Sequence, residues 1–443
     1  MIKRDQEAWH DLIVPFQRIY KGDCLERLKE VPDSSVDSVV CDPPYHLTSI
    51  VERYSSENAA PAGFGTDGAF ARASRGFMGK EWDGGDIAFR VDVWRECLRV
   101  LKPGGHLIAF GGTRTVHRIA CAIEDAGFEI RDMISWLYFS GFPKSHNISK
   151  AIDRAAGVDR PVVAEAPQSG AKFNMTQQLM DNGGFNDPER SSFQITAPST
   201  EDAKRAEGLG TALKPAQEPA ILARKPLARG MSIAENWKRY GTGALRINDC
   251  RFAYGDPCWV GPRERLNYEH ISDSNVYGSY MDGSGQAYQG DHKPSKMASV
   301  SSEIGRWPAN IYQCPKPSRA EKESGLEKLN PIQGFEAVDR KEGSAGLKNP
   351  RAGAGRTAGE IRNSHPTVKP VGIMRWLVRL ITPEHGIVLD PFTGSGTTGV
   401  AACLEGVNFI GCELTPEYWP IIEGRIDFAR DQFKRDHSQT KLF

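Results

Sequence analysis

A carboxylate, two prolines and an aromatic ring follow directly after a predicted buried strand. Residues 36–41, VDSVVC, are mostly apolar and β-branched, and Asp42, Pro43, Pro44 and Tyr45 come next. Consecutive prolines cannot donate to a sheet ladder, so this segment must lie just beyond the carboxyl end of the strand. The prolines hold the Asp42 carboxylate and the Pro43 carbonyl in a fixed geometry and add no competing N–H group.

A second candidate site lies near the carboxyl terminus, where residues 386–413 read GIVLDPFTGSGTTGVAACLEGVNFIGCE. The pattern predicts a strand ending at Asp390, a turn containing Gly394 and Gly396, a helix, and a strand ending at Glu413. Glycines let the backbone approach a ligand closely, and a carboxylate at the second strand end can accept hydrogen bonds from the hydroxyls of a ribose. The segment therefore predicts a cofactor that contains adenosine.

The glycine turn also narrows the choice of cofactor. It lacks the third glycine of the dinucleotide fingerprint, and no Gly-Lys-Ser/Thr follows for a phosphate-binding loop, so NAD and ATP are disfavoured. S-adenosylmethionine, which has a ribose and no pyrophosphate, fits better. The alternative is a sharp strand-to-helix turn without a ligand.

With a methyl donor bound, the Asp42 segment suits the exocyclic amine of a nucleobase. The lone pair of such an amine is delocalised into the ring, and acceptors placed on its two hydrogens would localise that pair for attack on a methyl group. The Asp42 side chain and the Pro43 carbonyl can supply those acceptors. Tyr45 offers a face to a base that has left the duplex. The alternative is a proline-stiffened strand end with an incidental acid and ring.

These motifs and their order resemble the amino-methylating DNA methyltransferases, over roughly half of the chain. GDCLERLKEVPDSSVDSVVCDPPY (22–45) looks like the catalytic block of that family, and HPTVKP (365–370) with VLDPFTGSGTTGVAA (388–402) looks like its cofactor-binding block. LKPGGHLIAFGG and ALKPAQEPAILARKP (212–226) resemble core strands. The catalytic motif precedes the cofactor loop, as in the permuted beta group, and this order favours DNA over protein or RNA as substrate.

The resemblance implies a role for each matching residue. The catalytic residues would be Asp42, Pro43, Pro44 and Tyr45. Asp23 would lie near the adenine of the cofactor, Glu413 would bind its ribose, and Thr367, Lys369 and Pro370 would line its methionine end. The residues that wrap the cofactor would be Phe392, Thr393, Gly394, Ser395 and Gly396. Cys24, Asp390, Pro391, Thr397 and Thr398 would also belong to the cofactor-binding site. Within the family an aspartate at position 42 favours adenine N6 over cytosine N4.

Two blocks of alternating strands and helices must position these residues. The first runs from residue 17 to 134 and the second from 371 to 414, with a short β-like run at 218–225 between them. One doubly wound, mostly parallel Rossmann-like sheet, interrupted by a large irregular insert, explains both blocks with the fewest parts. The predicted divisions are a catalytic half (1–145), a low-complexity insertion (146–208), a core strand region (209–226), a target-recognition region (227–360), a cofactor-binding half (361–430) and a tail (431–443).

The DNA contacts are predicted from local charge. Residues 203–265 contain twelve Lys or Arg and six acids, a local excess of 12 − 6 = +6 in a chain whose formal net charge is zero. Arg224, Lys225, Lys238 and Arg239 are therefore predicted to contact phosphates, with a solvated basic surface as the alternative. Lys80 and Trp82, in a glycine-rich loop, are predicted to close over the DNA or the extruded base, unless the tryptophan is simply packed.

Composition places the remaining expectations. The nine cysteines include no Cys-x-x-Cys pair, so we expect reduced thiols and no metal site in a cytoplasmic protein. The beginning of the sequence has no apolar signal region, and no apolar run approaches ~18 residues, so no membrane association is expected. Double-stranded DNA is the expected partner, while a homodimer and a separate restriction endonuclease are left open. The rival functions are cytosine-N4 methylation, a catalytically idle DNA-binding protein on this fold, and an NAD-dependent oxidoreductase.

Overall fold

The computed structural model describes residues 14–45, 85–139, 145–167, 192–253, 256, 258, 305–334, 336–338 and 359–439. Its centre is an eight-stranded sheet in the order β1-β12-β11-β2-β3-β7-β4-β8. The strands are β1 Gln17–Lys21, β2 Val36–Cys41, β3 Leu101–Phe110, β4 Glu129–Leu137, β7 Gln217–Arg224, β8 Ile311–Gln313, β11 Ile387–Asp390 and β12 Asn408–Glu413.

The sheet is mostly parallel, and this confirms the predicted fold class. Within it only β7 runs against its neighbours, β3 and β4. From β2 the chain continues outward to β3, whereas from β11 it continues the other way to β12. The strand order therefore reverses between β2 and β11, and ligands of such sheets bind beside the carboxyl ends of the strands at that point.

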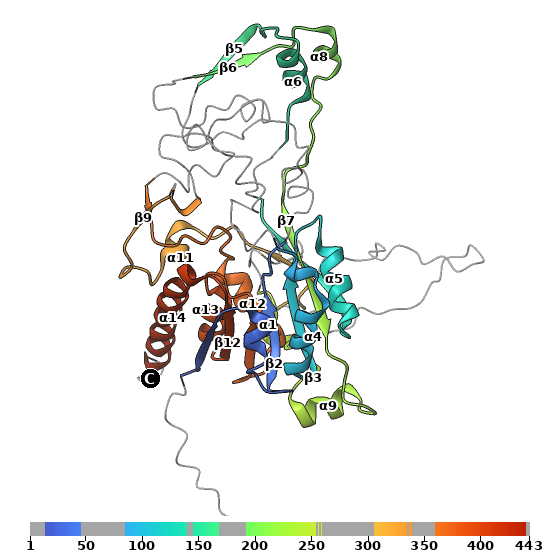
Figure 1. The fold of residues 1–443 in the computed structure, drawn as a ribbon, viewed down its shortest axis with the longest axis vertical. Coiled ribbons are helices and arrows are strands. Elements are labelled where there is room, and N and C mark those ends of the chain that lie inside the picture. The colour runs from blue at the N-terminus through green and yellow to red at the C-terminus, as the bar shows by residue number, and fades with distance from the viewer. Residues whose placement is uncertain are drawn as a thin grey trace, which may run out of the picture.

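Helices cover both faces of the sheet (Figure 1). One face packs against α1 Cys24–Leu28, α4 Val91–Val100 and α5 Val116–Asp125, and the other against α12 Val371–Ile381, α13 Thr397–Leu404 and α14 Trp419–Gln439. In α4 the buried residues Val93, Trp94, Cys97 and Val100 recur at helical spacing, which explains why this segment forms a helix on the sheet. No helix in the described part of the chain has the length and apolar character needed to cross a bilayer.

LKPGG, the start of a run that resembles a core strand, forms the beginning of β3 at Leu101. One boundary differs from the sequence-based expectation. The predicted tail begins inside α14, which continues to Gln439, because Ala429 and Phe433 are still buried against the core.

The described parts of the predicted low-complexity insertion form a small module. It consists of α6 Ile148–Ala155, the antiparallel pair β5 Val162–Pro167 and β6 Ser192–Thr196, and α8 Glu201–Arg205. Its centre is the buried Asp153 carboxylate, which accepts hydrogen bonds from Arg160 and from the backbone N–H groups of Ser199 and Thr200. Figure 1 shows this module well away from the sheet.

The described parts of 227–360 lie largely against the core, rather than in a separate recognition domain. They include α9 Ile233–Tyr240, strand β8 of the sheet, and α11 Arg319–Glu323, while β9 Ile332–Gln333 pairs with β10 Glu360–Ile361. Short 3-10 helices among the described residues are η3 Ile87–Phe89, η4 Asn248–Cys250, η6 Glu336–Val338 and η10 Pro416–Tyr418.

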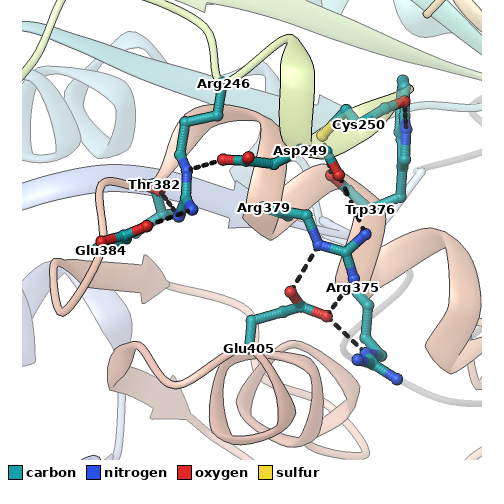
Figure 2. A network of polar contacts seen from close by, with 9 residues as sticks. All are labelled: Arg246, Asp249, Cys250, Arg375, Trp376, Arg379, Thr382, Glu384 and Glu405. Carbon is teal, nitrogen blue, oxygen red and sulfur yellow. Dashed lines mark hydrogen bonds and ion pairs between the residues drawn. The ribbon is translucent and has the colours of Figure 1, made fainter. Parts of the chain in front are cut away.

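A polar network fastens the segment around η4 to the core (Figure 2). Arg379 on α12 donates to the Asp249 carbonyl and to Glu405, which follows α13. Arg246 donates to the Thr382 carbonyl and to Glu384. These contacts bind η4, α12 and the end of α13 together.

Candidate active site

A cavity of about 600 Å³ lies where the strand order reverses. Its walls combine the segment after β2, the glycine turn after β11 and the end of β12, which are far apart in the sequence. Of the predicted catalytic and cofactor residues, those at the wall are Asp23, Cys24, Asp42, Pro43, Pro44, Tyr45, Thr367, Lys369, Asp390, Pro391, Phe392, Thr393, Gly394, Ser395, Thr397, Thr398 and Glu413. Pro370 and Gly396 lie behind it, as the N-caps of α12 and α13.

The two carboxylate oxygens of Asp42 differ in their contacts with the described residues. Its Oδ2 atom forms an ion pair with Lys369 Nζ. Its Oδ1 atom is shielded from solvent and has no hydrogen-bond partner among the described residues. A buried acceptor without a partner is costly, so Asp42, which lines the cavity, keeps an acceptor position that a bound group could satisfy.

Tyr45 is positioned by contacts at both its backbone and its hydroxyl. The Thr115 hydroxyl donates to its carbonyl at 2.9 Å, and its own hydroxyl donates to Glu218 Oε2 at 3.1 Å. A methyl group at Gly112 would stand 3.3 Å from the Tyr45 ring, so a glycine there leaves room for the ring. The ring is thereby fixed at the cavity wall beside Asp42.

Burial and charge set the protonation of this cluster. Burial raises the pKa of Asp42 above its usual value, although the charge of Lys369 opposes the effect. Burial alone would lower the pKa of Lys369, but the charges of Asp42 and Glu218 raise it above its usual value. Burial would raise the pKa of Glu218, yet the neighbouring lysines bring it below its usual value. Lys369 is therefore a stable cation between two acids.

The glycine turn is built around Asp390 and Glu413. Asp390 accepts from the Phe392 N–H at 2.9 Å and the Thr398 hydroxyl at 2.5 Å, and burial raises its pKa to about 7. Glu413 Oε2 accepts from the Gly394 N–H, and Oε1 accepts from the N–H of Thr415, both at 2.7 Å. These contacts fix the loop beside the cavity and leave Glu413 with further acceptor positions.

Gly394 is required by its backbone. It has a positive φ of 55°, and a methyl group there would stand 2.8 Å from His365 Nε2. Another residue at this position would be strained and would collide with the imidazole. The turn is therefore narrow at the place where a cofactor would approach the backbone.

Asp23 and Cys24 form the remaining wall. Asp23 is the N-cap of α1, with its carboxylate accepting from the Leu25 and Glu26 N–H groups. Burial raises the pKa of the Cys24 thiol to about 12, so it lines the cavity as a neutral group. Asp23 thus has a structural role as a cap in addition to the predicted position beside adenine.

Sequence reasoning missed Glu218, Lys316 and Trp136, which also line the cavity. Glu218 lies at the start of β7, and because β7 is antiparallel its amino end meets the carboxyl ends of β3 and β4. An antiparallel direction for β7, had it been predicted, would have placed Glu218 at this edge of the sheet. Lys369, predicted at the methionine end of the cofactor, lines the cavity, and its ammonium pairs with Asp42.

The predicted DNA-contacting residues do not gather at this cavity. Arg224 is 7% exposed and pairs with Glu129, and Lys225 donates to the Leu101 carbonyl at 2.6 Å. These contacts engage the buried Arg224 and the partly buried Lys225 at the end of β7 opposite Glu218, so they do not favour a phosphate contact by this pair, which stays a prediction.

Lys238 and Arg239 are exposed on α9, which is fastened to the Pro103 carbonyl at the amino end of β3. This is the edge of the sheet opposite Asp42, because β2 and β3 are parallel. Lys238 and Arg239 therefore lie away from the cavity, and their contact with phosphates stays a prediction. Lys80 and Trp82 lie outside the described residues.

The residues present fit S-adenosylmethionine. Glu413 can accept from ribose hydroxyls, and the glycine turn and Asp42 line the same cavity. Adenosine and the reacting groups can therefore share one cavity.

Comparisons with known proteins agree with this interpretation of the site. Residues 36–424 match the sequence model of an N6/N4 methyltransferase family described as DNA methylase. The Type II methyltransferase M.HindIII of Haemophilus influenzae is 21% identical over 424 residues, covering 93% of this chain and 96% of that protein. M.ScaI of Streptomyces caespitosus is 32% identical over 169 residues, which are 37% of this chain and 40% of that protein.

Two solved structures are also similar. The complex of M1.HpyAVI with SAM is 16% identical with a TM-score of 0.38, covering 93% of this chain and 100% of that one. The cytosine-N4-specific PvuII DNA methyltransferase is 14% identical with a TM-score of 0.41, covering 95% of this chain and 94% of that one. The family match, which spans most of the sequence, is the finding that decides: the chain belongs to the N6/N4 DNA methylase family and is an S-adenosylmethionine-dependent DNA methyltransferase.

Proposed function

We propose that this enzyme methylates the exocyclic N6 amine of adenine in double-stranded DNA, after the base has left the helix. The observation that carries the proposal is the Asp42 carboxylate at the cavity wall, with Oδ2 held by Lys369 and Oδ1 shielded and without a partner among the described residues. An amine that donates to Oδ1 would satisfy that oxygen.

The residues of the chain prepare the amine for attack. Asp42 Oδ1 and the Pro43 carbonyl would each accept a hydrogen bond from one N–H of the amine. These two hydrogen bonds localise the lone pair on the nitrogen. The Tyr45 ring, fixed through its hydroxyl and its carbonyl, would support the face of the base. Bound S-adenosylmethionine supplies an electrophilic methyl group. The protein contributes orientation and hydrogen-bond acceptors, and it needs no covalent link to the base.

Adenine is favoured over cytosine because position 42 carries a carboxylate, which the resemblance associates with adenine. Cytosine N4 is the alternative, since its amine presents the same two hydrogens. DNA that contains all four bases should be methylated with isotope-labelled S-adenosylmethionine, digested to nucleosides and separated. We expect label in N6-methyl-2′-deoxyadenosine. Label in N4-methyl-2′-deoxycytidine would assign the alternative, and label in a carbon-methylated base would contradict the role given to Asp42.

Partners follow from the same proposal. The relatives named Type II methyltransferases support a proposal that the enzyme recognises a defined site and acts beside a separate restriction endonuclease. Sequencing with modified-base detection, on DNA from cells that express the enzyme, should show methylation confined to one short motif. Methylation without sequence context would contradict site-specific recognition. A homodimer stays a prediction, which sedimentation with and without DNA would test.

A further inference from the structure

Lys369 lies at the centre of a buried cluster that joins three distant segments. Its ammonium pairs with Asp42 after β2 and lies 3.3 Å from Glu218 Oε2 at the start of β7. It also donates to the Tyr45 hydroxyl at 3.0 Å, and that hydroxyl in turn donates to Glu218 at 3.1 Å. Asp42, Tyr45, Glu218 and Lys369 therefore form one connected set of contacts, and Tyr138 adds a hydrogen bond to Glu218.

The Lys369 ammonium is buried among aromatic rings and acids. The Lys369 side chain is 6% exposed, and its ammonium lies 4.9 Å from the centre of the Phe110 ring and 5.2 Å from that of Tyr45. Two acids share this one cation, and Lys316 approaches the other oxygen of Glu218 at 3.8 Å. A charge buried in such a place is stable only while its partners remain.

We propose that Glu218 and Lys369 are positioning residues for methyl transfer. Lys369 fixes the plane of the Asp42 carboxylate by holding Oδ2, so that Oδ1 is directed at the target amine. Glu218 fixes both the Lys369 ammonium and the Tyr45 hydroxyl, so that the carboxylate and the ring keep one relative orientation. The inference rests on the methyltransferase activity of the family and holds for adenine or cytosine as the acceptor.

A double-mutant cycle separates positioning from simple structural support. Lys369→Met leaves the two acids facing each other without their cation, so one of them takes up a proton at neutral pH. Protonated Asp42 is a poor acceptor, and the single-turnover rate should fall about 100-fold or more. Glu218→Gln alone should lower the rate by roughly tenfold, because one orienting hydrogen-bond acceptor of a charged pair is lost.

The double variant should methylate faster than Lys369→Met alone. Removing the Glu218 charge lets Asp42 ionise again, so a substitution that harms the parent enzyme rescues the lysine variant. A cluster that served only folding would instead give two losses that add. Tritium transfer to total DNA is the readout, because it does not depend on which base is methylated.

The pH profile gives an independent measurement. The groups that face Asp42 are Tyr45, Glu218 and Lys369, with Lys316 behind Glu218 and Asp390 at the end of β11. In Lys369→Met the rate should rise with pH as Asp42 ionises. In Glu218→Gln the fall of the methyl-transfer rate at low pH, the acid limb of the profile, should occur at lower pH than in the parent. The reason is that a negative charge beside Asp42 is gone. This second variant keeps the proposal testable if Lys369→Met does not fold.

Glu129→Gln is the matched control. Glu129 lies on β4 and pairs with Arg224 at the end of β7 opposite Glu218. Its loss therefore removes a paired acid from the same two strands without touching the cavity. It should leave the rate and the pH profile at the parent values. The proposal is overturned if the losses in Glu218→Gln and Lys369→Met add, or if the acid limb of Glu218→Gln stays in place. If no variant transfers methyl groups and the parent does not either, the failure lies with the activity rather than with the cluster.

Discussion

Replacing Glu413 should weaken S-adenosylmethionine binding. Glu413 is 7% exposed, lines the cavity, and uses one acceptor position on each oxygen for the Gly394 and Thr415 N–H groups. A carboxylate has about four acceptor positions, so about two remain for the hydroxyls of a ribose. Glu413→Ala removes them, and losing hydrogen bonds from a charged acceptor costs about 1.5–3 kcal/mol, or roughly 10- to 150-fold in affinity.

Isothermal titration of the purified variant with S-adenosylmethionine measures this loss. Glu413→Gln is not a conservative substitution here. The glutamine side chain has one acceptor oxygen, and its NH2 group would face a backbone N–H where a carboxylate oxygen now accepts. We expect it to bind weakly as well. Glu405→Ala is the matched control, because Glu405 is a similarly buried carboxylate after α13 that pairs with Arg375 and Arg379 away from the cavity. Parent-like affinity in a folded Glu413→Ala protein would refute the ribose role.

Two further predictions concern charges inside the fold. Arg224→Ala should lower the free energy of unfolding by about 1–3 kcal/mol, with the smaller values applying because Glu129 is partly exposed. The dependence of DNA affinity on salt concentration should stay unchanged. A smaller slope of log affinity against log salt would instead indicate that Arg224 contacts a phosphate. Asp390→Asn should flatten the pH dependence of stability. Burial raises the folded pKa of Asp390 from 3.8 to about 7, so between those pH values the unfolded chain ionises while the folded protein keeps its proton. The free energy of unfolding of the parent therefore falls as the pH rises, by about 1.4 kcal/mol for each pH unit. Chemical denaturation of both proteins across that range measures their free energies of unfolding against pH. The two plots would run parallel if Asp390 ionised with an ordinary pKa, and that result would contradict the prediction.

The sheet and its helices could be predicted because their patterns are local. The apolar run of β2 ends at Asp42, and the apolar face of α4 recurs at helical spacing, so both elements follow from adjacent residues. The two halves of the site could also be predicted to meet, since parallel strands share one carboxyl edge.

The contacts of the site could not be predicted, because they depend on long-range pairing. The sequence shows Glu218 only as an acid in a basic segment, and its place beside Lys369 follows from the antiparallel direction of β7. Arg224 looked available because its segment is basic, yet register places it opposite Glu129. The module around Asp153 was missed for a related reason: a buried carboxylate with many donors, rather than apolar residues, organises it.

The central claim is that Asp42 acts on the amine in the transition state, and a single-turnover assay of Asp42→Ala tests it most directly. In this variant Lys369 keeps Glu218 and Tyr45 as partners, so no lone buried charge should disturb the fold. Cofactor and DNA should still bind, while the rate of methyl transfer falls by ~100- to 1000-fold, the loss of about 3–4 kcal/mol expected for a preorganised hydrogen-bonding group. Asp42→Asn, which keeps an acceptor oxygen, should fall less. Methyl transfer by Asp42→Ala at the parent rate, with binding intact, would contradict the account.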